Sequence, residues 1–228
     1  MELTIIFAMD EELKAFLNLF PTYETTPFKG RTLYTVSHSN HTVTALKSGI
    51  GKTHAAYVTA LLLDREKPDA LFNVGVAGGL NVTLGTLVVG TKCAYHDVDV
   101  TPFGYPYGQM AGAPEAFDAD PGLLEAIRSS LDHAQFPHAE GTILTGDQFV
   151  QSRRTLEEAM NAFPEALVVD MEAASIAHVA RLESVPFLSL RTVSDELDTD
   201  IQMDTYELEM EKSALQAAKT VKAMIEKL

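Results

Sequence analysis

The sequence predicts an α/β protein in which helices cover both faces of a mixed, largely parallel central sheet, a three-layer αβα sandwich. Short β-branched apolar runs alternate along the chain with segments whose apolar residues recur at helical spacing. The 228 residues, of which 46% are hydrophobic, are enough for one large core. Neither a repeat nor a linker interrupts the pattern, so residues 1–228 are expected to form a single domain.

The elements follow from this alternation in order. A buried strand is expected at 3–7, and the acids that follow it open a helix over 10–20. Further strands are predicted at 32–36 and 42–46, which form a hairpin across Asn40, and at 70–74, 87–93, 141–144, 167–170 and 187–193. Further helices are predicted at 53–63, 122–134, 155–163, 172–182 and 206–228, the last of them on the surface. Residues 97–118 combine proline and glycine with aromatic residues, and such a long loop is more often functional than idle.

Composition excludes several classes of protein. A net charge of −15 disfavours nucleic acid and anionic membranes as partners. No apolar run is long enough to span a membrane, and the N-terminus is expected to be a strand instead of a signal peptide. Cys93 is the single cysteine, which excludes a disulfide framework and makes the cytoplasm the expected location.

Three motifs are incomplete. Gly51-Lys52-Thr53 follows a strand as a phosphate loop would, but Leu46 stands where that loop needs its first glycine. Gly49-Ile50-Gly51 lacks the third glycine of a dinucleotide-binding turn. His96, Asp97 and Asp99 resemble metal ligands, yet a hydrogen-bonded loop is the favoured interpretation. The sequence therefore predicts no cofactor and no metal.

Ligands in open α/β sheets bind at the carboxyl ends of strands, where this sequence places several chemically useful residues. The glycine-rich segment 75–79 could turn tightly and admit a flat ligand, or be an ordinary turn. Glu172 could bind a vicinal diol at a helix N-terminus, or merely cap its helix. Asp195 could be a desolvated acid, or the partner of a structural ion pair, and Glu12 could be catalytic or simply solvated.

The set of motifs resembles bacterial 5′-methylthioadenosine/S-adenosylhomocysteine nucleosidases of the nucleoside phosphorylase superfamily, nearly from end to end. The matching segments are AMDEE at 8–12, KSGIGK at 47–52, GVAGG at 75–79, YHDVDVT at 95–101, FGY at 103–105, GDQFV at 146–150, DMEA at 170–173 and RTVSD at 191–195. The resemblance implies a nucleoside phosphorylase-like fold. It also implies hydrolysis of the N-glycosidic bond of 5′-methylthioadenosine and S-adenosylhomocysteine, with release of adenine and with 5′-deoxyadenosine as a further expected substrate.

The resemblance also implies roles for individual residues. Glu12 would activate the attacking water with help from Arg191, and Asp195 would protonate N7 of adenine. Glu172 would bind the ribose hydroxyls. The remaining substrate-binding residues would be Met171 under the sugar, Phe149 and Val150 at the base, Ser194, Ile50, Val76, Ala77 and Gly78. Val100 and Phe103 would complete the 5′ pocket of the partner subunit in a homodimer.

Three alternatives stay open: a phosphate-dependent purine nucleoside phosphorylase, a catalytically silent nucleoside-binding protein, and a hydrolase acting mainly on 6-amino-6-deoxyfutalosine. An acid at position 12 disfavours the phosphorylase, because Glu12 would repel a phosphate dianion. Two departures from the family pattern affect substrate choice. Val76 stands where many members have a serine that helps hold the water, and Thr205 stands where many have an aromatic residue over the 5′ group. Met203 or Tyr206 could replace that aromatic residue.

Overall fold

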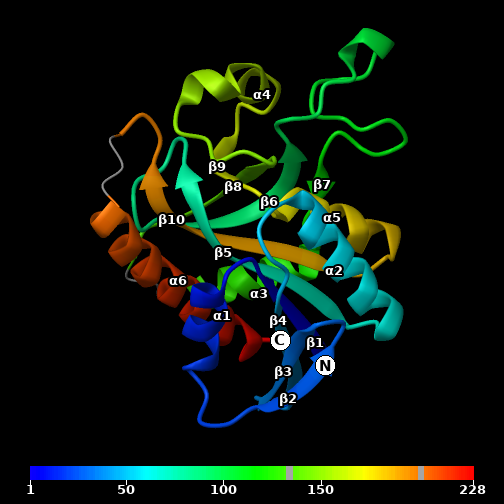
Figure 1. Cartoon of the computed structure of the whole chain (residues 1–228), viewed down its shortest axis with the longest axis vertical. Coiled ribbons are helices and arrows are strands. Elements are labelled where there is room, and N and C mark those ends of the chain that lie inside the picture. Colours follow the sequence, from blue (N-terminus) through cyan, green and yellow to red (C-terminus); the bar gives the residue numbers. More distant parts are fainter. Residues whose placement is uncertain (132–135, 200–202) are drawn as a thin grey trace.

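The computed structural model describes residues 1–131, 136–199 and 203–228, with residues 203–206 described by their backbone alone (Figure 1). The strands are β1 (Glu2–Phe7), β2 (Glu24–Phe28), β3 (Arg31–His38), β4 (His41–Lys47), β5 (Ala70–Gly79), β6 (Leu87–Tyr95), β7 (Phe117–Asp118), β8 (His138–Thr145), β9 (Ala166–Asp170) and β10 (Phe187–Glu196). The helices are α1 (Asp10–Leu17), α2 (Lys52–Arg65), α3 (Pro121–Leu131), α4 (Glu157–Ala162), α5 (Ala173–Leu182) and α6 (Met203–Ile225), with 3₁₀ turns η1 (Thr101–Phe103) and η2 (Arg153–Leu156).

Within the described residues, the strands join in one mixed sheet in the order β10-β6-β8-β9-β5-β1-β4-β3-β2, with β7 paired to β6. Strand β1 lies parallel to both β4 and β5, and β8 lies parallel to both β6 and β9. Strand β10 pairs with β5 as well as with β6, so β10, β6, β8, β9 and β5 close into a ring. The predicted mixed α/β sheet is confirmed, and the ring draws several strand ends together.

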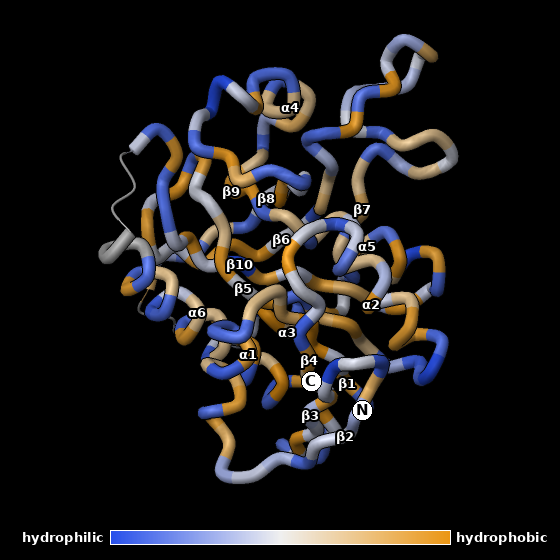
Figure 2. The backbone as a smooth tube through the Cα atoms, viewed as in Figure 1, coloured by the Kyte–Doolittle hydropathy of each residue, from blue (hydrophilic) through white to orange (hydrophobic). Residues whose placement is uncertain are grey.

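Helices cover both faces of the sheet. Helices α1, α3 and α6 pack together on one face, and α2 packs with α5 on the other (Figure 1). One buried apolar cluster lies beneath each group, and the tube in Figure 2 is most hydrophobic along the central strands between them. Phe16 and Phe72 are representative of the first cluster, and Leu46 and Ile176 of the second. The apolar stripes that predicted these helices are therefore the surfaces that bury the sheet.

Strand β5 corrects the prediction of a tight turn at 75–79. The strand continues through Gly79 because β10 pairs with it in parallel, Arg191 opposite Gly75 and Val193 opposite Ala77. The register then shifts, so that Asp195 lies opposite Gly78. A bulge of this kind re-aims the side chain that follows it, and here that side chain is the Asp195 carboxylate.

Helix α6 corrects a second expectation, that the last helix lies on the surface. It packs against β10, β5 and α1, and it buries Ala217, Val221 and Met224 among other residues. The acids and lysines whose side chains are described lie on the outer face of the helix, and this charge pattern made the buried apolar residues on its inner face hard to predict.

Strand β2 was not predicted at all, and its exposed residues pair with β3 at the sheet edge. No helix among the described residues has the length and hydropathy of a membrane span.

Candidate active site

An open cleft with about 630 Å³ of empty space lies where β1, β5, β8, β9 and β10 end. The residues lining it are Ala8, Met9, Glu12, Ile50, Val76, Ala77, Gly78, Gln148, Phe149, Val150, Val169, Asp170, Met171, Glu172, Ser194 and Asp195. The structure thus brings together eleven of the fourteen candidate residues, from segments far apart in the sequence. The rule that ligands bind at strand ends accounts for this convergence, because each segment follows or ends a strand of the sheet.

Glu12 is buried at the floor of the cleft, with only 3% of its surface exposed. Its Oε2 accepts hydrogen bonds from the backbone N–H groups of Ala8 (2.9 Å) and Met9 (3.0 Å). Its Oε1 accepts one from the N–H of Val76, at 3.0 Å. Burial raises the pKa of Glu12, and the Arg191 charge and these backbone bonds partly offset the rise. The alternative of a solvated helix acid is wrong, and a fixed carboxylate with raised proton affinity suits a general base.

Gly75 makes room for that carboxylate. A Cβ at this position would lie 2.9 Å from Glu12 Cδ and closer still to Oε1, well inside ordinary contact. The next residue, Val76, holds Glu12 through its backbone N–H and not through its side chain. The replacement of serine by valine therefore leaves the hydrogen bond from residue 76 to Glu12 intact.

Glu172 enters the cleft from the N-terminus of α5. Its Oε1 accepts the backbone N–H of Gly51 at 2.9 Å, and its Oε2 lies 4.0 Å from Arg191 Nη2. The Glu172 side chain does not cap α5; instead Asp170 Oδ2 accepts the N–H of Ala173 at 2.9 Å. Burial, followed by the Asp170 charge, raises the pKa of Glu172 to about 8. The sequence led us to expect that the N-terminus of α5 keeps Glu172 ionised. That expectation left out the charge of Asp170, which favours the protonated form of Glu172.

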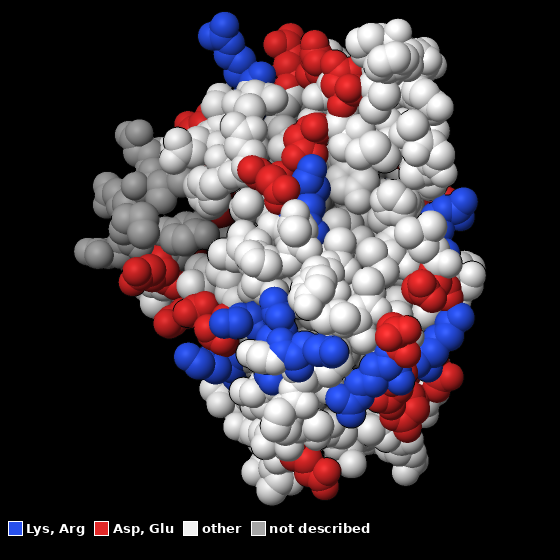
Figure 3. All heavy atoms as spheres, turned by 45° about the vertical axis from the view of Figure 1, so that its right-hand side comes forward, with Lys and Arg blue, Asp and Glu red and all other residues white. Residues whose placement is uncertain are grey.

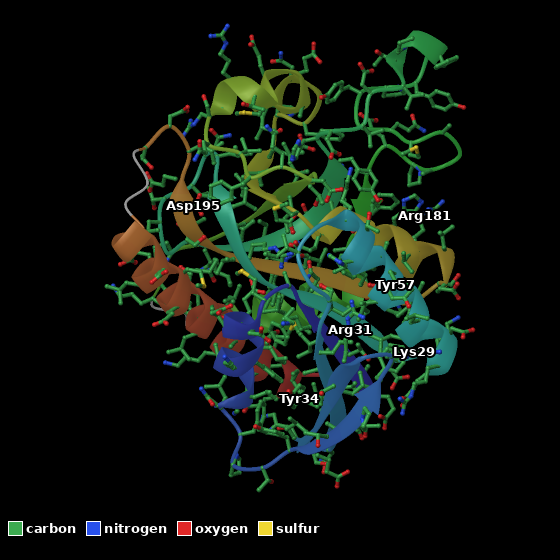
Figure 4. The ribbon with its side chains drawn as sticks, viewed as in Figure 1. Lys29, Arg31, Tyr34, Tyr57, Arg181 and Asp195 are labelled. Atoms are coloured by element: carbon green, nitrogen blue, oxygen red, sulfur yellow. The ribbon has the colours of Figure 1, made fainter. Side chains whose placement is uncertain are left out.

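Asp195 reaches the cleft at the end of β10, where Figure 4 labels it. Its Oδ1 accepts a hydrogen bond from Ser194 Oγ at 2.8 Å. Among the described residues no lysine or arginine forms an ion pair with it, so the alternative of a structural salt bridge is wrong. Burial raises the pKa of Asp195, with the Ser194 hydroxyl opposing the rise. A carboxyl group of this kind can donate a proton nearer neutral pH than an exposed aspartate.

The remaining wall of the cleft is mostly apolar. Phe149 is 51% exposed, and Val150 beside it is buried. Met171 lies between Asp170 and Glu172, and Ile50 precedes the Gly51 amide that binds Glu172. An exposed aromatic ring that lines the same cleft as buried acids fits a flat base with a sugar attached.

Sequence reasoning missed five lining residues: Ala8, Met9, Gln148, Val169 and Asp170. Each directly adjoins, or lies within a few positions of, a residue that was chosen. The signal that could have identified them was therefore the strand end itself. Asp170 is the most consequential omission, because its carboxylate contacts both Arg191 and the start of α5.

Arg191 lies behind the cleft and does not line it. It is 1% exposed, and its guanidinium donates to Asp170 Oδ2 from Nε (3.0 Å) and Nη2 (2.5 Å). Nη2 also donates to Asn73 Oδ1, and Nη1 to the carbonyl of Leu190. The positively charged group thus acts on the cleft through the acids around it.

Val100 and Phe103 lie outside the cleft, on the long loop after β6. This loop extends away from the body of the molecule (green, upper right in Figure 1), and Phe103 is 81% exposed. The candidates Met203, Thr205 and Tyr206 for closing the 5′ pocket have side chains outside the described part of the structure.

Asp97 belongs to a hydrogen-bonded loop, as expected. Its two carboxylate oxygens each lie 2.7 Å from Lys52 Nζ, and Oδ2 also accepts the N–H of Asp147. Asp147 in turn accepts the backbone N–H of Lys52 at 2.7 Å. These bonds connect the loop after β6, the start of α2 and the loop that carries Phe149. In the described residues no group of three or more His, Cys, Asp or Glu side chains is arranged to hold a metal ion.

Comparison with known proteins identifies the family. The model of the phosphorylase superfamily matches residues 2–228. The 5′-methylthioadenosine/S-adenosylhomocysteine nucleosidase of Streptococcus pneumoniae, solved with a transition-state inhibitor, is 35% identical with a TM-score of 0.91, and the match covers 100% of this chain and 99% of that one. The corresponding enzyme of Neisseria meningitidis, in complex with methylthio-immucillin-A, is 32% identical with a TM-score of 0.92 over 100% and 99% of the two chains.

A futalosine hydrolase of Helicobacter pylori is 28% identical with a TM-score of 0.92, covering 100% of this chain and 98% of that one. The expected fold and family are confirmed by these full-length matches. The chain belongs to the phosphorylase superfamily and, within it, to the 5′-methylthioadenosine/S-adenosylhomocysteine nucleosidases, which are N-glycosyl hydrolases.

Proposed function

We propose that this protein hydrolyses the N-glycosidic bond of 5′-methylthioadenosine and S-adenosylhomocysteine, releasing adenine and the 5-thio-substituted ribose, with 5′-deoxyadenosine as a further substrate. The observation that carries the proposal is the meeting of Glu12, Glu172 and Asp195 in one cleft beside an exposed aromatic ring. Relatives of known structure bind adenine or nucleoside analogues of this kind, which supports the same ligand class here.

Asp195 would act as the general acid. Cleavage of the bond moves negative charge onto the base, and a proton donated to N7 turns adenine into a neutral leaving group. The raised pKa of Asp195 favours the protonated carboxyl that this step requires. Ser194, which already donates to Asp195 Oδ1, would stabilise the carboxylate left after transfer.

Glu172 and Glu12 would act on the sugar side. The departing base leaves an oxocarbenium-like ribosyl cation, which an ionised Glu172 bound to the 2′- and 3′-hydroxyls would stabilise electrostatically. Glu12 would take a proton from the attacking water while the oxygen of that water forms the new bond to C1′. Arg191 is proposed to bias these acids through its charge, since its guanidinium is engaged by Asp170 and Asn73.

Water is favoured over phosphate as the nucleophile. A phosphate dianion needs arginine or lysine donors, but the ionisable side chains that line the cleft are all acids. Glu12, held in place by three backbone N–H groups, would repel the dianion. We therefore infer that water, and not phosphate, is the nucleophile.

A second candidate substrate is 6-amino-6-deoxyfutalosine. The match to a futalosine hydrolase at 28% identity favours it, and the cleaved bond and the three acids would be the same. The two substrates differ only at the 5′ group. That part of the ligand would lie near Ile50 and the partner's loop after β6, and the departure from the family pattern at Thr205 concerns the same 5′ group.

We also propose that residues 1–228 form a single domain that functions in the cytoplasm as a homodimer. Residues 101–114 contain no charged side chain, and the upper right of the face in Figure 3, which this loop occupies, is correspondingly uncharged. A ring as exposed as Phe103 on such a loop is typical of a contact surface. The partner's copy of Val100 and Phe103 would then close the 5′ end of the cleft.

The proposal is tested with a panel of nucleosides in phosphate-free buffer, with free adenine detected by mass spectrometry. 5′-Methylthioadenosine and S-adenosylhomocysteine should be cleaved, and 6-amino-6-deoxyfutalosine distinguishes the second candidate. Adenine release that depends on added phosphate would indicate a phosphorylase. Binding of 5′-methylthioadenosine without turnover would indicate a silent binding protein.

A further inference from the structure

Arg191 lies between two acids of the site but is shared unequally between them. Asp170 Oδ2 accepts from Arg191 Nε at 3.0 Å and from Nη2 at 2.5 Å. Glu172 Oε2 approaches the same guanidinium no closer than 4.0 Å, beyond hydrogen-bond range. In a buried environment, a carboxylate that accepts hydrogen bonds from a guanidinium has a lower pKa than one whose nearest cation lies beyond hydrogen-bond range. The division of one arginine between the two acids therefore matters for the cleft.

Asp170 is itself fixed by further bonds. Thr145 Oγ1 donates to its Oδ1 at 2.5 Å, and the Ala173 N–H donates to its Oδ2 at 2.9 Å. Asn73 Oδ1 also accepts from Arg191 Nη2, and Asn73 is anchored by its own amide, which donates to the Ile6 carbonyl at 3.0 Å. The guanidinium is thus held on the side of Asp170, away from Glu172.

We propose that Asp170 is a positioning residue that withholds the Arg191 guanidinium from Glu172, which leaves Glu172 Oε2 available to accept hydrogen bonds from the sugar hydroxyls. The inference rests on the proposed function, because it assumes that Glu172 binds the ribose. If Glu172 formed a close ion pair with Arg191, a neutral hydroxyl would have to compete with a guanidinium for the same oxygen. The charge-assisted bond is roughly twice as strong as a bond to a neutral donor, so the sugar would bind weakly.

The charges around Glu172 agree with this division. Asp170 faces it from β9, Arg191 from β10 and Glu12 from α1, and the Gly51 N–H donates to it from the start of α2. Burial and the two acids raise the pKa of Glu172 to about 8, and Arg191 offsets only part of that rise. A neutral residue at position 170 would remove one repelling charge and weaken the bonds that hold the guanidinium away from Glu172. Both effects would favour ionised Glu172.

Asp170→Asn is the direct test, since asparagine can place its oxygen toward Ala173 and Arg191 and its amide toward Thr145 Oγ1. The dissociation constant of 5′-methylthioadenosine would be measured against pH by calorimetry, in a Glu12→Gln background that prevents turnover and removes the Glu12 titration. With aspartate at 170, affinity should fall about tenfold per pH unit below the pKa of Glu172, which the loss of the Glu12 charge lowers from about 8. With asparagine, the fall should begin at a lower pH, and binding at pH 9 should be several-fold weaker because Arg191 competes with the sugar.

Adenine, which lacks the sugar, serves as the control ligand, and its pH dependence should be the same with either residue at 170. Glu140→Gln serves as the control variant, because it removes another arginine-paired carboxylate, that of the exposed Arg128–Glu140 pair. Superimposable curves for aspartate and asparagine, or a shift to higher pH, would overturn the proposal.

A measurement on the unsubstituted enzyme covers the case in which Asp170→Asn does not fold. Carbon-13 NMR of glutamate-labelled protein, with Glu172→Gln to assign the resonance, should show Glu172 titrating near pH 8. Titration near the ordinary glutamate value would mean that Arg191 already pairs with Glu172, and would overturn the proposal. This titration is independent of catalysis. Loss of the proposed function would appear separately, as absence of adenine release.

Discussion

Gly75→Ala tests whether the position of the Glu12 carboxylate controls the reaction. The added Cβ would lie 2.9 Å from Glu12 Cδ, whereas non-bonded carbons prefer ~3.5–4.0 Å. Gly75 is held in register opposite Arg191 by β10, so the Glu12 side chain is the group that must move, by about 1 Å. A misplacement of about 1 Å in a catalytic group can cost on the order of 10²-fold in rate.

We therefore expect Gly75→Ala to lower kcat for 5′-methylthioadenosine by about 100-fold. Adenine release would be followed in phosphate-free buffer, and thermal melting would confirm that the variant folds. Gly122→Ala is the matched control, because it adds the same methyl group at the exposed start of α3, where the nearest atom is Asp120 Oδ1 at 3.2 Å. Its kcat should not change.

A double substitution makes the test specific to Glu12. In a Glu12→Gln background, turnover is already nearly abolished, so adding Gly75→Ala should cost little more. If Gly75→Ala folds and retains the original kcat, the geometric reasoning is refuted. If its loss is fully additive with that of Glu12→Gln, the methyl group acts through something other than the Glu12 carboxylate.

Four further predictions follow from the same site. Asp195→Asn should lower kcat on the order of 10²–10⁴-fold and abolish the alkaline limb of the pH profile of kcat/KM, because that limb reflects loss of the proton that burial helps Asp195 retain. Lys52→Met should raise KM about tenfold with little change in kcat, since it releases Asp97 and the loop carrying Phe149, whereas Arg128→Met should change neither. Phe103→Ala should raise KM and weaken dimers in sedimentation; a fully active variant with an unchanged oligomeric state would contradict the shared pocket. Glu172→Gln should stabilise the fold at pH 9 by a few kcal/mol and hardly at pH 5, measured by melting, because the cost of ionising the buried carboxyl grows by about 1.4 kcal/mol per unit between pH 4.5 and 8.

The sign of that last effect follows from the raised pKa. Between pH 4.5 and 8 the folded state retains the Glu172 proton and the unfolded state has lost it, so raising the pH favours unfolding. Above the folded-state pKa the penalty is constant. Glutamine has no ionisation to suppress and can still accept the Gly51 N–H. An equal melting temperature of the two proteins at pH 9 would show that Glu172 is not destabilising when ionised.

Local pattern was sufficient for most of the fold and for the cleft. The strand expected at 3–7 forms over 2–7 and the helix expected over 10–20 forms over 10–17, and the strand-end rule brought Glu12, Glu172 and Asp195 together correctly. The failures depend on tertiary partners. Strand β5 continues through its glycines only because β10 pairs beside it, and α6 is buried only because α1 and β10 cover its inner face.

The role of Asp170 had the least sequence signal. Its position is explained by hydrogen bonds to Thr145 and Arg191, 25 and 21 residues away, and neither spacing has a local signature. Arg191 became a candidate only through the resemblance to the nucleosidases. That its guanidinium donates to Asp170 and not to Glu172 could be found only from the packed geometry.

The charge balance of the cleft is unusual for a buried site and agrees with the chemistry proposed for it. Four carboxylates, those of Glu12, Asp170, Glu172 and Asp195, line the cleft with a single guanidinium behind them, and burial raises the pKa of Glu12, Glu172 and Asp195. Such a cleft is poorly compensated when it holds no cation. A ribosyl cation formed between Glu12 and Glu172 supplies the missing positive charge at the moment when the base departs. Interactions that strengthen only as charge develops stabilise the transition state more than the bound nucleoside, and this is the condition for raising kcat.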